Sequence, residues 1–457
     1  MNLCVLILAA GKGTRMYSNL PKVLQLIAKK PLLQHVLDTI QSLPTSATFI
    51  IYGYGGDQVK AAIKSPSITC VEQKEQFGTG HAVMQSLPFL KDDDRVLILA
   101  GDVPFISAET LSRLINATPD QAIGWLTAQV KNPVGLGRIV RDALNQPVAI
   151  VEEKDAREKQ KNIHEINTGI CLIPVPYLRR WLPELKNNNA QKEYYLTDLF
   201  SRAVAEQIPL ITVEAANETE ILGINTPVQL AECERLYQRR QADLLMTKGL
   251  TLIDPARFDI RGELTFSHDV TIDINVILEG IVTIGHSCYI GPNVCLKNVT
   301  IGDQVKIEAN SVIEDAIIEN ECVVGPFARI RPGTVLHEKA KIGNFVEIKK
   351  SHIGKNSKVN HLSYVGDTLM GEHVNVGAGT ITCNYDGVNK FQTIIENDVF
   401  IGSNTALVAP ITLEEGSTIG AGSVVARNTP KHKLTLARAR QTTLDNWQRP
   451  KKQEKGN

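Results

Sequence analysis

The feature of this sequence that most restricts its fold is a six-residue spacing of aliphatic side chains in the C-terminal half. Isoleucine, leucine or valine recurs at every sixth position from Ile272 to Leu296 and then, with occasional steps of five, as far as Val425. Glycine often follows the aliphatic residue, as at Gly285 and Gly402. A short fixed period held over roughly 150 residues is typical of a parallel β-helix built from hexapeptides.

The hexapeptide pattern resembles that of left-handed β-helices, in which three hexapeptides form one triangular coil. Residues three hexapeptides apart then stack on adjacent coils, at about 4.8 Å between strands. Some coils are shorter by a single position, because the spacing shortens to five at 296–301, 313–318, 348–353 and 365–370. The repeat breaks between Thr382 and Ile395, so the intervening segment must leave the coil as a loop. Since rigid scaffolds often carry functional residues on such loops, we expect part of a site there.

The N-terminal half alternates short apolar runs with helical segments. The runs Val5–Ala9, Phe49–Tyr52 and Val96–Ala100 predict strands buried on both faces. Helical segments at Pro31–Ser42 and Gly80–Leu87 lie between them, and this order predicts a parallel, three-layer, Rossmann-like α/β domain. Further strands are expected at residues 137–141, 148–152 and 166–173.

A helix is expected to connect the two halves. After Pro227, an apolar stripe at helical spacing comprises Leu230, Cys233, Tyr237 and Leu244. We therefore divide the chain into an N-terminal domain (1–226), a helical linker (227–248) and a C-terminal β-helix domain with a tail (249–457).

The composition excludes several classes of protein. Forty-nine basic residues balance 49 acidic ones, which gives no indication of a nucleic-acid binder. The apolar N-terminal run is too short to span a membrane and lacks the preceding basic stretch of a signal peptide. The eight cysteines form no CxxC pair, so neither a zinc site nor a redox motif is indicated. We expect a cytoplasmic protein with reduced thiols.

A glycine-rich turn, LAAGKGTRM at residues 8–16, follows the first expected strand. Its small residues allow the backbone to approach a ligand, and N–H groups at a helix start can bind phosphate. The turn is not a Walker A motif, and Met16 stands where GxGxxG requires a third glycine. Asp102 also comes just after a strand, where open α/β sheets bind ligands. From these residues alone, an ordinary strand-to-helix turn and a capping aspartate remain open alternatives.

The whole string LAAGKGTRM, followed by Pro21 and Lys22, resembles the sugar-phosphate nucleotidyltransferase family. The resemblance implies that a sugar-1-phosphate attacks the α-phosphorus of UTP without a covalent enzyme intermediate. It implies that Asp102 and Asn225 hold Mg²⁺, and that Arg15 and Lys22 neutralise phosphate charge. The remaining residues that the resemblance assigns to binding are Leu8, Ala9, Ala10 and Gly11 for uridine and its phosphates, Gln73, Gly78 and Thr79 for uracil, Ala100 and Gly101 for substrate, and Gly137, Glu152 and Asn167 for the sugar. Glu152 is preferred to its neighbour Glu153 because IVE aligns with the family pattern.

Two features of the β-helix half could bind a ligand. Arg331 and Lys349 are separated by three full hexapeptides with no shortened step between them, so they should stack on adjacent coils. Stacked cations indicate either an anion clamp or a nearby compensating acid. His361 should lie next to Ala378, one shortened coil further on, which would leave space for a ligand beside the imidazole. An ordinary surface or core histidine remains the alternative.

The strings FVEIKK, HLSYVGD and NVGAGTITCNYDG, taken with the first half, resemble the family of bacterial bifunctional N-acetylglucosamine-1-phosphate uridylyltransferases and glucosamine-1-phosphate N-acetyltransferases. The resemblance covers almost the entire chain. It implies that His361 is the general base that accepts a proton from the glucosamine amine. It assigns the sugar phosphate to Arg331, Lys349, Tyr364, Asn375 and Lys390, and acetyl-CoA to Ala378, Asn384, Tyr385, Ser403, Ala421 and Arg438. It also implies a homotrimer that makes UDP-N-acetylglucosamine for cell-wall polymers.

Three alternatives are weaker. A single-activity nucleotidyltransferase with a non-catalytic, oligomerising β-helix does not account for the matches at His361 and Asn384. A β-helical binding protein does not account for Asp102 and Asn225 appearing with the glycine-rich turn. A metal-dependent β-helix hydratase would need several histidines on neighbouring coils, but the spacings of 15, 9 and 12 between His337, His352, His361 and His373 do not match stacking one coil apart. The tail at residues 431–457, with eight basic and two acidic residues, is expected to be solvated beyond Trp447.

Overall fold

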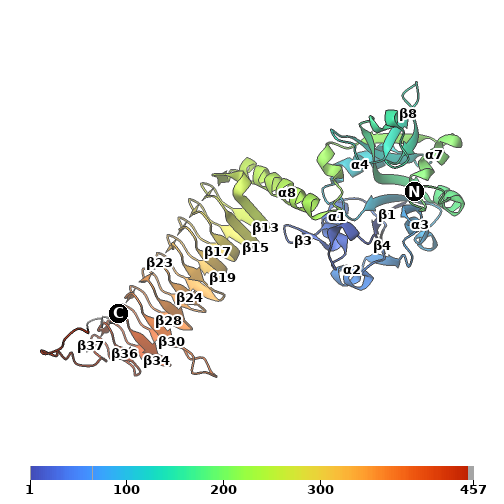
Figure 1. Ribbon diagram of the computed structural model, residues 1–457. Helices are drawn as coiled ribbons and strands as arrows, with labels where there is room; N and C mark the ends of the chain where they lie inside the picture. The colour runs from blue at the N-terminus through green and yellow to red at the C-terminus, as the bar shows by residue number, and fades with distance from the viewer. Residues whose placement is uncertain (1, 64, 451–457) are drawn as a thin grey trace, which may run out of the picture. The chain divides into compact units, whose positions relative to one another are not determined.

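The computed structural model describes residues 2–63 and 65–450 and divides into two compact units (Figure 1). The first unit extends to Tyr237 and the second begins at Gln238. Within the described residues, no helix is long and apolar enough to cross a membrane.

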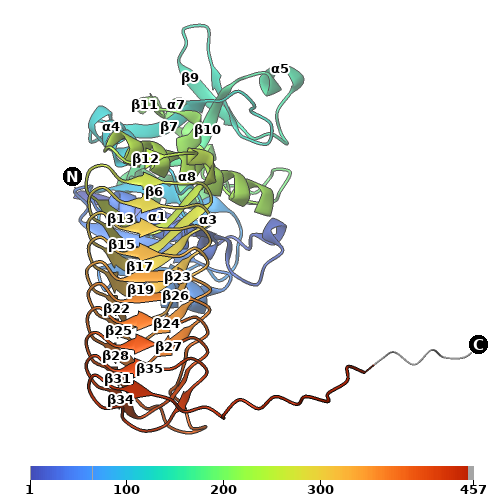
Figure 2. The same cartoon turned by 90° about the vertical axis from the view of Figure 1, so that its left-hand side faces the viewer.

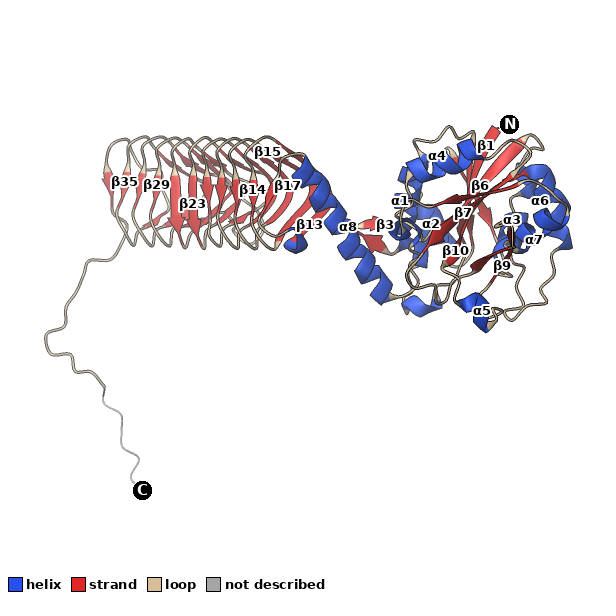
Figure 3. Ribbon diagram, turned by 90° about the horizontal axis from the view of Figure 1, so that it is seen from above, coloured by secondary structure: helices blue, strands red, loops and turns tan. Residues whose placement is uncertain are grey.

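A sheet of nine strands forms the centre of the first unit, and its main path runs β11-β7-β10-β6-β1-β4-β5. Helices cover both of its faces (Figure 3). The strands of the path are β1 (Asn2–Ala9), β4 (Ala47–Tyr52), β5 (Ile68–Glu72), β6 (Asp94–Ala100), β7 (Ile123–Gln129), β10 (Glu165–Pro174) and β11 (Leu210–Glu214), with β8 (Arg138–Arg141) and β9 (Pro147–Val151) as a hairpin beside β10. The helices are α1 (Leu32–Ile40), α2 (Gly56–Ala62), α3 (Thr79–Met84), α4 (Ala108–Ala117), α5 (Glu158–Lys161), α6 (Val175–Trp181) and α7 (Asp198–Ala205).

Two apolar cores, one on each face of this sheet, explain why its buried strands are continuous apolar runs in the sequence. In β1, Val5 and Ile7 pack with residues of α1, α2 and α4, whereas Leu6 packs with residues of α3, α6 and α7. Because both faces are covered, successive residues of the strand are all buried, and the sequence shows no polar alternation.

The predicted parallel arrangement is confirmed for β1, β4 and β6, the three strands on which it rested, but it does not extend to the centre of the sheet. Strand β10 lies between β6 and β7 and is antiparallel to both. Parallel neighbours need a crossover connection, usually a helix, but β7 is followed by the β8–β9 hairpin and the single helical turn α5. Strands β5, β7 and β11 were also not predicted.

The expected connector is α8 (Pro227–Thr247). Cys233 and Tyr237 belong to an apolar cluster of the first unit, whereas Ala242 and Leu245 belong to the core of the second. The expected single stripe was therefore wrong at Leu244, which is exposed. The helix carries two stripes on different faces, since two different cores cover its two halves.

The second unit is a left-handed β-helix, as predicted, with parallel strands stacked on three faces. Figure 2 shows the strands of one face, from β13 to β34, one above another. The first face consists of β12 (Thr251–Leu252), β14 (Thr271–Ile272), β16 (Tyr289–Ile290), β18 (Lys306–Ile307), β20 (Val323–Val324), β23 (Lys341–Asn344), β26 (Lys358–His361), β29 (Asn375–Val376), β32 (Phe400–Ile401), β35 (Thr418–Ile419) and β37 (Leu434–Thr435).

Long strands in the first four coils cover both remaining faces, which separate further along the chain. The long strands are β13 (Phe258–Phe266), β15 (Val276–Ile284), β17 (Cys295–Ile301) and β19 (Val312–Ile318). The second face continues with β21 (Arg329–Ile330), β24 (Glu347–Lys349), β27 (Tyr364–Gly366), β30 (Ile381–Cys383), β33 (Ala406–Val408) and β36 (Val424–Val425). The third continues with β22 (Thr334–Leu336), β25 (His352–Ile353), β28 (Thr368–Met370), β31 (Thr393–Ile395) and β34 (Ile411–Leu413).

The register agrees with the coil lengths predicted from the sequence. Ile330 pairs with Ile348, one full coil further on, and Ile348 pairs with Val365, one shortened coil further on. The pairing of Met370 with Ile395 spans the expected loop. The aliphatic column is therefore continuous along the inside of the β-helix, and the residues beside it stack in columns outside.

Candidate functional sites

A cleft of about 470 Å³ opens at the carboxyl ends of β1 and β6 in the first unit. Most of the residues predicted to bind nucleotide or sugar line it, namely Leu8, Ala10, Gly11, Lys22, Gln73, Gly78, Thr79, Ala100, Asp102, Glu152 and Asn167. Ala9 and Gly101 are buried behind this lining. Arg15 is exposed on a short 3-10 turn (Thr14–Met16) and makes no hydrogen bond or ion pair among the described residues.

The Lys22 ammonium lies between the two residues predicted to hold a metal. Its Nζ forms an ion pair with Asp102 Oδ2 and donates to Asn225 Oδ1 at 3.0 Å. Asn225 itself is held by its backbone N–H, which donates to Gln229 Oε1 at 2.8 Å. Two protein oxygens from distant parts of the chain thus converge on one positive charge. Among the described residues, no cluster of three or more His, Cys, Asp or Glu side chains forms a metal site.

Gln73 is fixed at one end of the cleft. It is 2% exposed, and its amide donates to the carbonyl of Gly78 at 3.2 Å. Gly78 has a φ of +108°, and a Cβ there would lie 2.7 Å from the carbonyl oxygen of Tyr194. The glycine is therefore required both for the backbone conformation and for close packing. Thr79 Oγ1 accepts from the N–H of Leu196 at 3.0 Å, which ties α3 to the other wall.

Glu152 faces the cleft, whereas its neighbour Glu153 does not line it. Glu153 accepts from Arg138, a side chain that is 1% exposed, at 2.6 Å. Burial raises the pKa of Glu152, whose nearest partner is the Thr197 hydroxyl at 3.4 Å. Gly137 does not line the cleft but packs against Glu152, because a Cβ there would lie 3.2 Å from the carboxylate.

Asn167 is held by two donors. Its Oδ1 accepts from Trp125 Nε1 at 2.7 Å and from the N–H of Gly169 at 2.9 Å, which leaves its amide N–H groups for a ligand.

The sequence reasoning missed lining residues on the segment before α7, namely Gln191, Glu193, Tyr195, Leu196 and Thr197. This segment carries no motif, and it reaches the cleft through the fold alone.

Three cations gather on the second face of the β-helix. The backbone N–H of Arg331 donates to the carbonyl of Ile348, which confirms that Arg331 stacks next to Lys349. Its guanidinium pairs with Glu347 at 2.8 Å, so the compensating acid considered above exists for Arg331. Lys349 and Lys390 have no ion pair among the described residues, and the pKa of Lys349 is lowered, chiefly by the adjacent Lys390 ammonium. Two neighbouring ammonium groups without a carboxylate pair favour an anionic ligand.

Lys390 arrives at this position because the predicted loop folds into a small hairpin. Tyr385 and Lys390 form an antiparallel bridge. The Asp386 carboxylate accepts from the N–H groups of Val388 and Asn389 at 2.8 and 2.6 Å, which closes the tip. Asn384 is 6% exposed and donates to Asp367 at 2.6 Å, which anchors the hairpin to the preceding coil.

His361 lies at the corner between the first and second faces. Its Nδ1 lies 2.8 Å from Asn344 Oδ1, one coil earlier in the register. The N–H of Gly379 donates to the carbonyl of His361, so Ala378 is the next residue in the column, as predicted. Tyr364 lies beyond the corner on β27, and Asn375 lies on β29 of the first face.

The three small residues predicted to contact acetyl-CoA form one column that begins next to His361. The N–H of Asn404 donates to the carbonyl of Ala378 and that of Gly422 to the carbonyl of Ser403, each at 2.8 Å. Ala421 continues the column, and its carbonyl accepts from Arg438 Nη1 at 2.8 Å. The column thus consists of small side chains and ends at the Arg438 cation.

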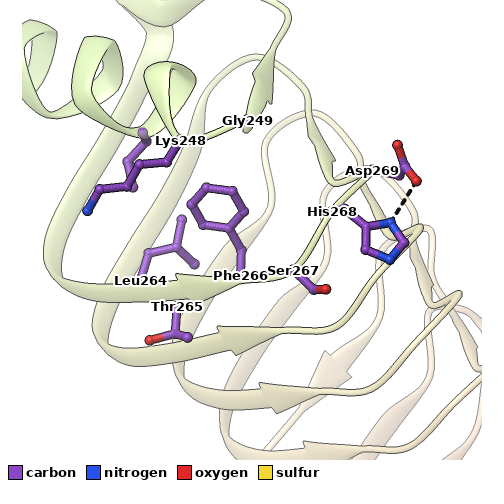
Figure 4. A pocket seen from close by; sticks show the side chains of 9 residues that line it. Lys248, Gly249, Leu264, Thr265, Phe266, Ser267, His268 and Asp269 are labelled. Atoms are coloured by element: carbon purple, nitrogen blue, oxygen red, sulfur yellow. Dashed lines mark hydrogen bonds and ion pairs between the residues drawn. The ribbon is translucent and has the colours of Figure 1, made fainter.

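A separate pocket of about 620 Å³ opens at the first coils of the β-helix (Figure 4). Leu264 and Phe266 contribute its apolar wall, and His268 is turned toward Asp269, with Nδ1 at 2.8 Å from the carboxylate. It contains none of the predicted site residues, and its polar groups do not converge, so we assign it no chemistry.

Comparisons with known proteins place this chain in a family. Residues 5–167 match the model of the MobA-like NTP transferase domain, residues 260–344 that of the GMPPB C-terminal domain, and residues 392–427 that of the hexapeptide repeat of succinyl-transferase. The bifunctional protein GlmU of Marinobacter nauticus is 51% identical over 98% of this chain and 99% of its own. The corresponding GlmU of Idiomarina loihiensis is 52% identical over the same shares.

The chain belongs to the bifunctional GlmU family. The family predicted from the sequence is thereby confirmed, and the chain is a two-domain uridylyltransferase and acetyltransferase. A solved UDP-glucose pyrophosphorylase in complex with UDP-glucose is 16% identical, with a TM-score of 0.44 over 52% of this chain and all of that chain. The nucleotidyltransferase and hexapeptide domains agree with substrates that include a nucleotide and acetyl-CoA.

Proposed function

We propose that His361 and the cation cluster acetylate glucosamine-1-phosphate with acetyl-CoA, and that the cleft of the first unit then transfers UMP from UTP to the N-acetylglucosamine-1-phosphate formed. The observation that carries the proposal is the neighbouring pair Lys349 and Lys390, which lies on the face that adjoins the corner of His361. An anion site near a general base suits a substrate that contains both a phosphate and an amine.

In the acetyl transfer, the glucosamine amine attacks the carbonyl carbon of the acetyl thioester. His361 Nε2 accepts a proton from this amine, the C–S bond breaks, and the proton is returned to the coenzyme A sulfur. Lys349, Lys390 and Arg331 bind the phosphate and fix the distance of the amine from His361. Tyr364 and Asn375 would contact the sugar from the two faces that meet at this corner. Catalysis then depends on general base action and on positioning.

The column of Ala378, Ser403 and Ala421 supports an extended acetyl-CoA along the β-helix, with Arg438 at the end where coenzyme A carries phosphate. Asn384 and Tyr385, at the base of the hairpin, would contact the acetyl end. Since Ser403 and Ala421 are exposed, a neighbouring copy of the chain would cover the other side of a bound acetyl-CoA.

In the uridylyl transfer, the cleft binds UTP with uracil near Gln73, Gly78 and Thr79, and with phosphates near Gly11 and Lys22. Glu152 and Asn167 offer an acceptor and donors to the sugar hydroxyl and acetamido groups, with Gly137 behind them. The sugar phosphate oxygen attacks the α-phosphorus and pyrophosphate leaves. Arg15, which is exposed on its short turn, would contribute positive charge to the phosphates.

The residues present fit Mg²⁺ at Asp102 and Asn225. Their two oxygens already converge on a cation, the Lys22 ammonium, and oxygen ligands of this kind are those that Mg²⁺ prefers. When bound, the ion would neutralise charge on the phosphates of UTP. The Lys22 side chain has the length and charge to bind the phosphates once its ammonium is released from these two oxygens.

A homotrimer is part of the proposal. Phe327 and Phe345 stack with ring centroids 5.2 Å apart on the corner near His361, where Leu362 continues the column, and all three are exposed. An exposed apolar ridge of this kind supports association with another copy. A monomer in analytical ultracentrifugation at working concentration would contradict it.

The domain boundaries and a cytoplasmic location are also part of the proposal. We assign uridylyl transfer to residues 1–226, the linker to 227–248 and acetyl transfer to 249–457. All eight cysteines are free, which agrees with the reducing conditions of the cytoplasm.

The test is product identification with the purified full chain. Glucosamine-1-phosphate with acetyl-CoA should give N-acetylglucosamine-1-phosphate, and addition of UTP with Mg²⁺ should give UDP-N-acetylglucosamine, each assigned by mass spectrometry. Release of pyrophosphate from UTP and added N-acetylglucosamine-1-phosphate, without any acetylated product from glucosamine-1-phosphate, would assign the β-helix a non-catalytic role instead.

A further inference from the structure

We propose that Asn344 is a positioning residue for the acetyl transfer, which holds His361 in the tautomer whose Nε2 lone pair faces the substrate amine. The inference rests on the role of His361 given under the proposed function. The observation is the 2.8 Å distance between His361 Nδ1 and Asn344 Oδ1. Asn344 is half-buried at the end of β23, directly paired in the register with His361 at the end of β26.

An amide oxygen can only accept a hydrogen bond, so Nδ1 must carry the single N–H of the neutral imidazole. Nε2 is then left with its lone pair and can accept a proton. Without this acceptor both tautomers are populated, and the one protonated at Nε2 cannot act as the base. Asn344 also fixes the orientation of the ring, which otherwise turns freely because His361 is exposed.

The acceptor is a neutral amide rather than a carboxylate, and this choice has a chemical consequence. A carboxylate at Nδ1 would stabilise the imidazolium form, which cannot accept the proton of the amine. Glu347, on the adjoining face, is instead paired with Arg331 at 2.8 Å. Among the described residues, no carboxylate forms an ion pair with His361.

Other charged and titratable groups surround this corner. Lys358 lies on β26 with His361, Lys341 lies on the preceding strand β23, and Tyr364 lies across the corner on β27. Lys349 lies next to Gly366 in the register.

Two substitutions separate positioning from a purely structural role. Asn344→Ala removes the acceptor and should lower kcat for acetyl transfer about 10- to 100-fold, with KM for glucosamine-1-phosphate changed less than threefold. Asn344→Asp keeps an acceptor but adds charge. It should restore most of the activity at high pH while moving the acidic limb of the kcat/KM profile to higher pH, which a loss of packing would not do.

Asn310→Asp is the matched control. Its Oδ1 accepts from another asparagine, Asn293 Nδ2 at 3.1 Å, and it lies two coils earlier near the same corner. It should leave both kcat and the pH profile unchanged. Uridylyl transfer and the thermal unfolding midpoint, measured on the same preparations, report intact protein.

The outcomes distinguish this inference from the proposal beneath it. If His361→Ala abolishes acetyl transfer but Asn344→Ala keeps wild-type kcat, Asn344 has no positioning role. An Asn344→Asp profile that coincides with the wild-type profile overturns the inference equally. If His361→Ala itself keeps wild-type activity, His361 is not the base, and both proposals are wrong.

Discussion

Replacing Gly366 by alanine should disrupt the acetyltransferase site through a displacement that the structure lets us estimate. Gly366 is buried, and its φ lies outside the left-handed region, so the backbone itself tolerates alanine. Its missing side chain provides space, because a Cβ there would lie 2.4 Å from the Tyr364 hydroxyl and 2.9 Å from Asn384 Nδ2. The Gly366 N–H donates to Thr382 Oγ1 at 2.8 Å, which restrains the backbone from yielding instead.

Ordinary contact begins at 3.4 Å, so the Tyr364 hydroxyl must move by about 1 Å (3.4 minus 2.4) to admit the methyl group. A misplacement of about 1 Å in a catalytic site can lower the rate roughly 100-fold. We therefore expect Gly366→Ala to reduce kcat/KM for acetyl transfer by about two orders of magnitude, by moving Tyr364 and Asn384 away from substrate.

The assay follows coenzyme A release from acetyl-CoA with glucosamine-1-phosphate, and pyrophosphate release in the same preparation as a reference. Gly249→Ala is the matched control, since Gly249 has a φ of +102° and nothing within 4 Å of an added Cβ. It introduces backbone strain in the same unit without a clash, and should lower the unfolding midpoint while leaving acetyl transfer intact. A Gly366→Ala enzyme with wild-type kcat/KM would refute the steric reasoning.

Three further predictions follow from the charges at the two sites. Lys390→Met should raise KM for glucosamine-1-phosphate about tenfold or more. It should also raise the pKa of Lys349, because the like charge that lowers this pKa is gone. In labelling with an amine-reactive probe, Lys349 should then react at higher pH than in wild type, and an unchanged labelling profile would contradict the proximity of Lys349 and Lys390. Glu152→Gln should weaken binding of N-acetylglucosamine-1-phosphate about tenfold. It should also raise the unfolding midpoint at pH 7 but not at pH 4, because burial raises the pKa of this carboxyl, which therefore favours folding when protonated and loses that contribution as pH rises through the raised pKa. Equal effects on the midpoint at both pH values would show that burial does not govern the pKa of Glu152. Asn225→Ala should raise the Mg²⁺ concentration needed for half-maximal uridylyl transfer without affecting acetyl transfer, and an unaltered Mg²⁺ titration would remove Asn225 from the metal site.

Much of the fold could be predicted because its two halves have different periods. The inner column of the β-helix, such as Ile330, Ile348 and Val365, fixes both the stacking and the coil length, so neighbours across coils follow from counting. The α/β half was predicted less completely. The direction of β10 depends on how the β8–β9 hairpin turns the chain, and a continuous apolar run reads the same in either direction.

The site residues also differ in how far they could be predicted, depending on whether the regular repeat fixes their position. The stacking of Arg331 beside Lys349 follows from their spacing, whereas the return of Lys390 depends on the Asp386 turn, which the repeat does not specify. The preference for Glu152 over Glu153 rested on resemblance alone. In the structure the buried Arg138 engages Glu153 and leaves Glu152 facing the cleft. The cleft wall at Gln191–Thr197 has no local signal, because long-range packing brings it there.

The central claim, that one chain holds two independent catalytic sites, is tested most directly by complementation between two single variants. Asp102→Ala and His361→Ala proteins are assayed separately and then mixed, with glucosamine-1-phosphate, acetyl-CoA, UTP and Mg²⁺ supplied together. We predict that Asp102→Ala forms N-acetylglucosamine-1-phosphate only, that His361→Ala forms no product from glucosamine-1-phosphate, and that the mixture makes UDP-N-acetylglucosamine. An Asp102→Ala protein that forms no N-acetylglucosamine-1-phosphate, or a mixture that forms no nucleotide sugar, would contradict the assignment of the two reactions to two separate sites.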